Sequence, residues 1–147
     1  MNFEVVPEFE KSLKRLSKRY PSLKADYNAF LKELEKNPKI GDEIFPNCRK
    51  ARIAIKSKGK GKRGGARIIF YFEIVEDKII LLFIYDKSEM ENVQTAFIEH
   101  LLQQYMLDRG SLIDSGKSVN LTTPPYYTQE IMDENSIEKV PESYLMG

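Results

Sequence analysis

The feature that most constrains the fold of this chain is the run KIILLFIY at residues 78–85, which is almost continuously apolar. The run is too short to cross a bilayer, which needs about 20 apolar residues, and it has the length of a strand. A strand that is apolar on both faces has to be covered on both faces. Residues 78–85 therefore predict a central strand with a layer of structure on either side.

Three segments have the apolar spacing of amphipathic helices and are candidates to cover this strand. The first spans residues 9–20, and the second spans residues 23–34. The third is expected to begin at Ser88, which has capping-box spacing with Glu91, and to continue to about Met106. The first two predict a helical hairpin at the N-terminal end of the domain.

The remaining strands are expected at residues 2–6, 49–56 and 66–73. Residues 49–56 alternate, so that Lys50 and Arg52 lie opposite the apolar side chains and the strand displays a row of cations. The order β-α-α-β-β-β-α predicts an α+β fold. In this fold the N-terminal helical hairpin and a C-terminal helix pack on a small, mainly antiparallel sheet.

The chain is expected to divide into one domain, residues 1–107, and an acidic C-terminal extension, residues 108–147, which contains proline, serine and threonine. Residues 110–147 carry six acidic and two basic side chains, so they contribute −4 to the net charge of +1 and the preceding residues contribute +5. Opposite charges favour docking of the extension on the domain. The candidates for this contact are Ile131, Ile137, Leu145, Glu130, Asp133 and Glu134.

The chain is expected to be soluble and cytoplasmic. Its first residues lack the basic and then apolar order of a secretory signal, and no run is long enough to span a bilayer. The single cysteine, Cys48, can form no internal disulfide, which fits a reducing compartment. Because the chain has one histidine, a Cys/His nucleophile pair is not expected, and Cys48 is assigned a structural role.

A concentrated positive charge lies at residues 56–67, which hold six basic side chains and no acidic one. The glycines between them predict a flexible, basic turn that joins two strands. Such a field attracts polyphosphate, or an acidic protein segment that imitates it. The cations of the turn that are expected to bind RNA phosphates are Lys56, Lys58, Lys60, Lys62 and Arg63.

Other site chemistries find little support. The acidic residues and the single His100 show no metal-ligand spacing, and a surface position is expected for His100 because it falls in a helical pattern. The glycines at residues 59–65 lack the Gly-Lys-Ser/Thr ending of a Walker A loop, and they join two strands where a dinucleotide fold needs a strand followed by a helix. No metal and no cofactor are therefore expected.

Cations alone can support the cleavage of RNA. The ribose 2′-hydroxyl supplies the nucleophile, so the protein has to align it, take its proton and stabilise the charge on the phosphorane and the departing 5′-oxygen. Crowding by other cations lowers the pKa of a lysine, and the arginine fork matches phosphate oxygens. Lys50, Arg52 and Arg67 are also compatible with phosphate contact without chemistry, or with an exposed polar face of the sheet.

Two motifs resemble a known family of proteins. GKGKRGGARII at residues 59–69 and IYDKSEMEN at residues 84–92 are similar to the RelE/HigB-like toxins of the RelE/ParE superfamily. The spacing of the first helix and YPSL at residues 20–23 agree with this likeness, which covers residues 1–107. The resemblance implies a toxin that cuts messenger-RNA codons in the ribosomal A site and is held inactive by a cognate antitoxin.

The resemblance also assigns the expected catalytic residues. The two strand cations of the family correspond to Lys50 and Arg52. Its phosphate-binding arginine falls at Arg67, and its basic residue after the last strand falls at Lys87. All four positions carry a cation in this chain, so the resemblance implies a retained nuclease site.

The chain departs from the family where a substrate base is held. The family often has an aromatic residue early in its last helix, whereas the nearest match here is Val93, and Tyr71 and Tyr85 are candidates to replace it. A second branch of the superfamily, the ParE-like toxins, inhibits DNA gyrase and is not a nuclease. Retention of the four cations favours the nuclease, and a nucleic-acid-binding module without cleavage is a third interpretation.

Overall fold

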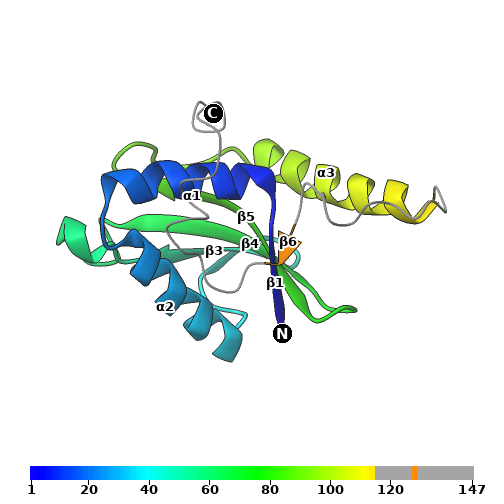
Figure 1. Ribbon diagram of the computed structural model, residues 1–147, viewed down its shortest axis with the longest axis horizontal. Helices are drawn as coiled ribbons and strands as arrows, with labels where there is room; N and C mark the ends of the chain where they lie inside the picture. Colours follow the sequence, from blue (N-terminus) through cyan, green and yellow to red (C-terminus); the bar gives the residue numbers. More distant parts are fainter. Residues whose placement is uncertain (115–126, 129–147) are drawn as a thin grey trace.

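Three helices pack on a mixed β-sheet in the computed structural model, which describes residues 1–114 and 127–128 (Figure 1). The α+β class that the sequence predicts is confirmed. The docking candidates of the acidic extension lie outside the described residues. Along the chain the elements are β1 (Asn2–Val5), α1 (Pro7–Arg19), α2 (Leu23–Lys36), β2 (Asp42–Phe45), β3 (Cys48–Ile53), the 3₁₀ turn η1 (Lys56–Lys58), β4 (Ala66–Glu73), β5 (Lys78–Asp86), α3 (Thr95–Asp114) and β6 (Tyr127–Thr128).

The main sheet has the strand order β2-β3-β4-β5-β1, and β6 adds a short antiparallel pair beyond β1. β1 runs parallel to β5, whereas β2, β3, β4 and β5 pair antiparallel in sequence order. The mainly antiparallel sheet is therefore confirmed. β1 pairs with β5 over residues 78–81 alone, so the second half of β5 extends beyond β1.

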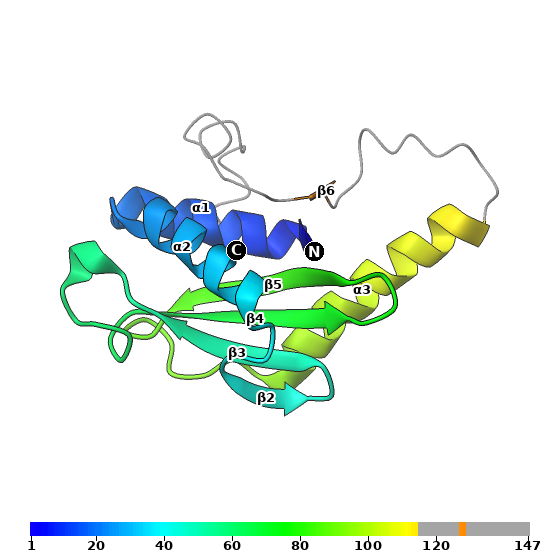
Figure 2. The same ribbon diagram turned by 90° about the horizontal axis from the view of Figure 1, so that it is seen from below.

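β5 is the central strand that its apolar run predicts. α1 and α2 lie on one face of the sheet, and α3 crosses the other face (Figure 2). On the first face the ring of Phe30 in α2 lies 6.3 Å from that of Phe70, and on the second the ring of Phe97 in α3 lies 5.2 Å from that of Phe83. Both faces of the strand are thus covered.

The apolar stripe of α1 supplies much of the first cover. α1 begins at Pro7, and proline suits the first helical turn because no hydrogen bond is needed from its nitrogen there. Phe9, Leu13 and Leu16 are fully buried in the core against the sheet. Burial of each such side chain contributes about 2 kcal/mol to the free energy of unfolding.

β2 is an element that the sequence does not predict. The glycine and the proline of residues 41–46 indicate a loop, but the chain forms a strand that pairs Phe45 with Cys48 across a turn. The turn is made by Pro46 and by Asn47, which has a φ of 68°, and these residues match the preferences of a type II turn. The turn, rather than an apolar alternation, sets this hairpin.

The start of α3 differs from the prediction. The capping-box spacing of Ser88 and Glu91 predicts a helix from Ser88, and this is wrong because α3 begins at Thr95. Ser88 instead turns back on the end of β5, where its N–H and its hydroxyl donate to the carboxylate of Asp86 at 2.9 Å and 2.8 Å. A competing carboxylate acceptor therefore takes the serine that would have capped the helix.

α3 also extends past its predicted end near residue 106, because it runs to Asp114. Tyr105 donates a hydrogen bond to Glu4 at 3.1 Å, and the guanidinium of Arg109 lies 3.3 Å from the same carboxylate. These contacts tie the second half of α3 to β1, so the expected domain boundary at residue 107 falls inside the helix. No helix in the described part of the chain is long and apolar enough to cross a membrane.

Candidate nucleic-acid interface

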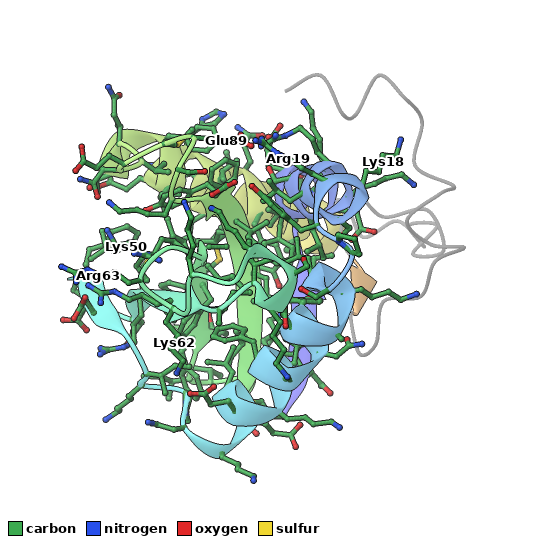
Figure 3. The ribbon with its side chains drawn as sticks, turned by 90° about the vertical axis from the view of Figure 1, so that its left-hand side faces the viewer. Lys18, Arg19, Lys50, Lys62, Arg63 and Glu89 are labelled. Carbon is green, nitrogen blue, oxygen red and sulfur yellow. The ribbon has the colours of Figure 1, made fainter. Side chains whose placement is uncertain are left out.

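The cations of β3 and β4 share one face of the sheet. Arg52 pairs with Arg67 across the ladder, and Arg67 pairs in turn with Tyr85 on β5. Directly opposed residues point to the same face, which here is the face that α3 crosses. Lys50 points the same way because it stands two residues before Arg52. In Figure 3 Lys50 lies on the same side of the view as Arg63 of the glycine-rich loop.

Arg67 is buried, with 6% of its surface exposed, and its guanidinium binds the backbone of the protein itself. It donates to the carbonyl oxygens of Lys62 at 3.0 Å, Arg63 at 3.1 Å and Ala66 at 3.2 Å. Arg67 therefore holds the glycine-rich loop against β4. Burial, and then the like charge of Arg52, lower the pKa of Arg67, so an anion bound beside both guanidinium groups would relieve their repulsion.

The glycine-rich loop, residues 59–65, forms a basic rim beside these strands. The chain turns at Gly59 and Gly61, whose φ angles of 73° and 62° favour glycine. Gly65 then passes so close to β3 that a Cβ would stand 2.1 Å from the carbonyl oxygen of Ile53. Four of the cations that the sequence assigns to phosphate binding are exposed here: Lys56, Lys60, Lys62 and Arg63.

Lys58 stands apart from these exposed cations because it is held in an internal ion pair. Its ammonium lies 2.5 Å from Asp86, a fully buried carboxylate, and 9% of the lysine side chain is exposed. Tyr20 at the end of α1 and Ser88 donate to the same carboxylate. Burial by itself would raise the pKa of Asp86, but the hydrogen bonds from Lys58, Tyr20 and Ser88 outweigh it and hold that pKa well below its usual range.

Lys87 follows β5 and lies beside the end of the glycine-rich loop. Its backbone N–H donates to the carbonyl of Gly65 at 3.1 Å, and its ammonium donates to the carbonyl of Glu91 at 3.3 Å. Gly65 immediately precedes β4, so Lys87 lies at the same end of the sheet as Arg67. The four cations that the resemblance assigns to catalysis are therefore gathered toward one end of the sheet.

The three positions considered for holding a base lie in different environments. Tyr85 is in the core, and its buried hydroxyl has no hydrogen-bond partner among the described residues. Burial raises the pKa of Tyr85, and the charge of Arg67 opposes this shift. Tyr71 is half-buried opposite Cys48, four residues and thus roughly 13 Å along β4 from Arg67. Val93 lines a groove before the start of α3.

This groove has a volume of about 810 Å³ and lies between α1 and the start of α3. Asn92 in its wall accepts a hydrogen bond of 3.2 Å from the ammonium of Lys50, which joins the groove to the cationic face. The helical spacing predicts Phe97 as a core residue, whereas it is half-buried and lines the groove. The lining residues are Glu8, Lys11, Ser12, Arg15, Phe83, Met90, Asn92, Val93, Gln94 and Phe97.

The two walls of the groove are joined by Glu89. The guanidinium of Arg15 lies 3.1 Å from this carboxylate, and Arg19 one turn further along α1 contacts it as well. Arg19 and Glu89 lie together at the end of α1 (Figure 3). The segment between β5 and α3 is thus fixed to α1 by charge, although no spacing in the sequence indicates this contact.

The other candidate groups of the sequence lie away from this chemistry. Cys48 is buried, and burial raises the pKa of its thiol to about 12, so it stays protonated and unreactive at neutral pH. His100 is exposed on α3, as expected. Within the described residues no group of three or more His, Cys, Asp or Glu is placed to hold a metal ion. No protein-family model matches the chain.

Proposed function

We propose that this chain is the toxin of a toxin–antitoxin pair and that it is a ribosome-dependent messenger-RNA endonuclease. Two things support the proposal: the likeness of its motifs to RelE/HigB-like toxins, and the position of four cations. Lys50, Arg52, Arg67 and Lys87 come from three segments of the chain and gather at one end of the sheet beside a basic loop. Cations arranged in this way suit a strand of phosphates.

Each cation has a task in the proposed reaction. The 2′-oxygen attacks the adjacent phosphorus, the bond from phosphorus to the 5′-oxygen breaks, and the products end in a 2′,3′-cyclic phosphate and a 5′-hydroxyl. Arg52 is exposed on β3, and its fork suits the phosphorane oxygens as charge builds up on them. Lys50 takes the proton of the 2′-hydroxyl, and Lys87 neutralises the leaving oxygen. Arg67 holds the loop and adds its charge to that of Arg52.

The test is to express the chain without its antitoxin and to map the ends of cellular RNA. Cuts inside translated codons are expected, and Arg52→Gln should remove them while the protein stays folded, because Arg52 is exposed. Lys18→Gln is the matched control, since Lys18 is an exposed cation on the side of the molecule away from Lys50 (Figure 3). DNA damage with intact messenger RNA would replace this proposal with inhibition of gyrase.

A second candidate function, RNA binding without cleavage, is favoured by the environment of Arg67. The backbone of the loop already occupies part of its donor fork through three hydrogen bonds. An arginine engaged in this way is less able to follow the charge of a transition state than an exposed one. Purified protein that binds RNA tightly but yields no 2′,3′-cyclic phosphate ends on ribosomes would select this second function.

A further inference from the structure

The groove between α1 and α3 exists because β5 is longer than its neighbour. β1 pairs with residues 78–81, and the chain then leaves the sheet to enter α1. The second half of β5 is thereby flanked by α1 on one side and by the approach to α3 on the other, with Phe83 between them. Its volume of about 810 Å³ falls within the range of sites that bind small molecules, about 300 to 1,000 Å³.

The lining of the groove suits a planar ring with a polar edge. The rings of Phe83 and Phe97 are 5.2 Å apart and meet at 82°, so a ring that stacks on one of them meets the other at an angle close to perpendicular. The amides of Asn92 and Gln94 and the hydroxyl of Ser12 supply neutral donors and acceptors at the walls. Stacking surfaces with amide groups beside them are the combination that recognises an unpaired nucleobase.

The groove is also continuous with the cationic face. The hydrogen bond of 3.2 Å between Lys50 and Asn92 means that a group leaving the groove past Asn92 meets the cation proposed to act on the RNA. On the opposite wall, Lys11 and Arg15 are placed to meet the next part of the strand. A base in the groove would thus have cations on both sides for its flanking phosphates.

We propose that this groove is the base-binding subsite of the protein and takes one unpaired base of an RNA strand whose phosphates lie on the face of Lys50 and Arg52. The inference rests on the proposed function and names how its substrate is held. A purely apolar peptide side chain would fit less well, because it would bury the amides of Asn92 and Gln94 without hydrogen bonds. Phe83 and Phe97 take the part that Val93 lacks.

The test measures the binding of short single-stranded RNA to the full chain. The probes carry 2′-O-methyl riboses, so that cleavage does not intervene, and one of them lacks the base at a single position. Phe97→Leu keeps an apolar side chain but removes the stacking ring. It should weaken the binding of the complete oligonucleotide about tenfold, as expected for the loss of one stacked base. Phe72→Leu, on the opposite face of the sheet, is the matched control.

The decisive result is the combination of the two changes. Removal of the base and Phe97→Leu should each cost about tenfold, and together they should cost no more than either alone. Fully additive losses, or binding that Phe97→Leu leaves unchanged, would overturn the subsite. Gln94→Ala serves if Phe97→Leu does not fold, because Gln94 is exposed. It should change the order of preference among the four bases, and an unaltered order would count against the groove.

These outcomes separate the subsite from the proposed function. If the base binds in the groove but native RNA is never cut, the subsite stands and the nuclease falls. If Arg52→Gln abolishes cleavage but base removal and Phe97→Leu are additive, the nuclease stands and the base is held elsewhere. Loss of an effect of Phe97→Leu on RNA, together with protection of the groove by an inhibitory protein, would assign the groove to that protein.

Discussion

Asp86 is a buried carboxylate that joins three parts of the chain. Lys58 of η1, Tyr20 after α1 and Ser88 after β5 all donate to it. A carboxylate without exposure to solvent is costly unless its oxygens are satisfied by charged or polar donors. The depressed pKa of Asp86 shows that these donors more than offset its burial. The contact therefore sets the position of η1, and through it the start of the glycine-rich loop.

Asp86→Asn should lower the free energy of unfolding by about 3 kcal/mol at pH 7, because it leaves the ammonium of Lys58 largely buried without a counter-charge. Since the pKa of Asp86 is lower in the folded state, its stabilisation is present above the unfolded value near pH 4 and is lost as the pH falls below it. Urea unfolding between pH 7 and pH 3 should show the gap between parent and variant narrowing. Glu99→Gln, exposed on α3, should change stability by less than about 0.5 kcal/mol. A gap that is constant with pH would contradict this assignment.

Arg67→Ala should abolish RNA cleavage and also loosen the glycine-rich loop. Its three hydrogen bonds to loop carbonyls are charge-assisted and buried, so their loss should cost about 2 kcal/mol of stability. Arg67→Lys keeps a charge but cannot fork to the same carbonyls, and it should lose most of the activity as well. The checks are urea unfolding and cleavage measured on the same preparations. A folded Arg67→Ala protein that cuts RNA at the parental rate would show that this face of the sheet is not the site.

The join between the glycine-rich loop and β3 should be sensitive to a single methyl group. A Cβ on Gly65 would stand 2.1 Å from a backbone oxygen of β3, whereas a Cβ on Gly61 meets nothing within 4 Å. Gly61→Ala should therefore cost about 1 kcal/mol, the penalty of its left-handed backbone alone. Gly65→Ala has to move backbone and should cost clearly more. Equal losses for the two variants in thermal unfolding would mean that the loop does not lie against β3.

At the scale of elements, the sequence predicts those that are defined by their own pattern. The apolar run of β5, the alternation of β3 and β4 and the helical stripes of α1 and α2 all appear in the structure. β2 and the start of α3 are missed because interactions distant from the pattern decide them. A turn with a positive φ at Asn47 sets β2, and the carboxylate of Asp86 takes Ser88 from its capping role.

The candidate site follows the same division. The alternation of β3 is enough to place Lys50 and Arg52 on one face, because side-chain direction in a strand follows from position. It cannot show that Arg67 is occupied by loop carbonyls or that Lys58 faces Asp86, because both contacts depend on how the loop folds back. The groove beside Phe97 is invisible in the sequence for the same reason, since its walls come from α1 and α3.

The molecule as a whole has opposite charges in its two parts. Residues 115–147 carry five acidic and two basic side chains, which sum to −3, so residues 1–114 carry +4. Within the described residues, Tyr127 and Thr128 return to the domain and pair with Val5 and Glu4 of β1. A tethered segment that contacts its own domain acts at a high effective concentration, on the order of millimolar for a short flexible linker.

Removal of residues 115–147 should therefore strengthen RNA binding by the domain. A cut after residue 107 would be unsuitable, because it divides α3 and removes Arg109 from its contact with Glu4. The gain should be several-fold at low salt and should fade toward 1 M salt, where the Debye length falls to about 3 Å. Fluorescence anisotropy with a 2′-O-methyl RNA measures it, and the full chain with Glu130→Gln, Asp133→Asn and Glu134→Gln should move toward the truncated protein. Affinities that coincide for the full and truncated chains at low salt would make the extension a passive appendage, because competition by its charge has to be strongest where screening is weakest.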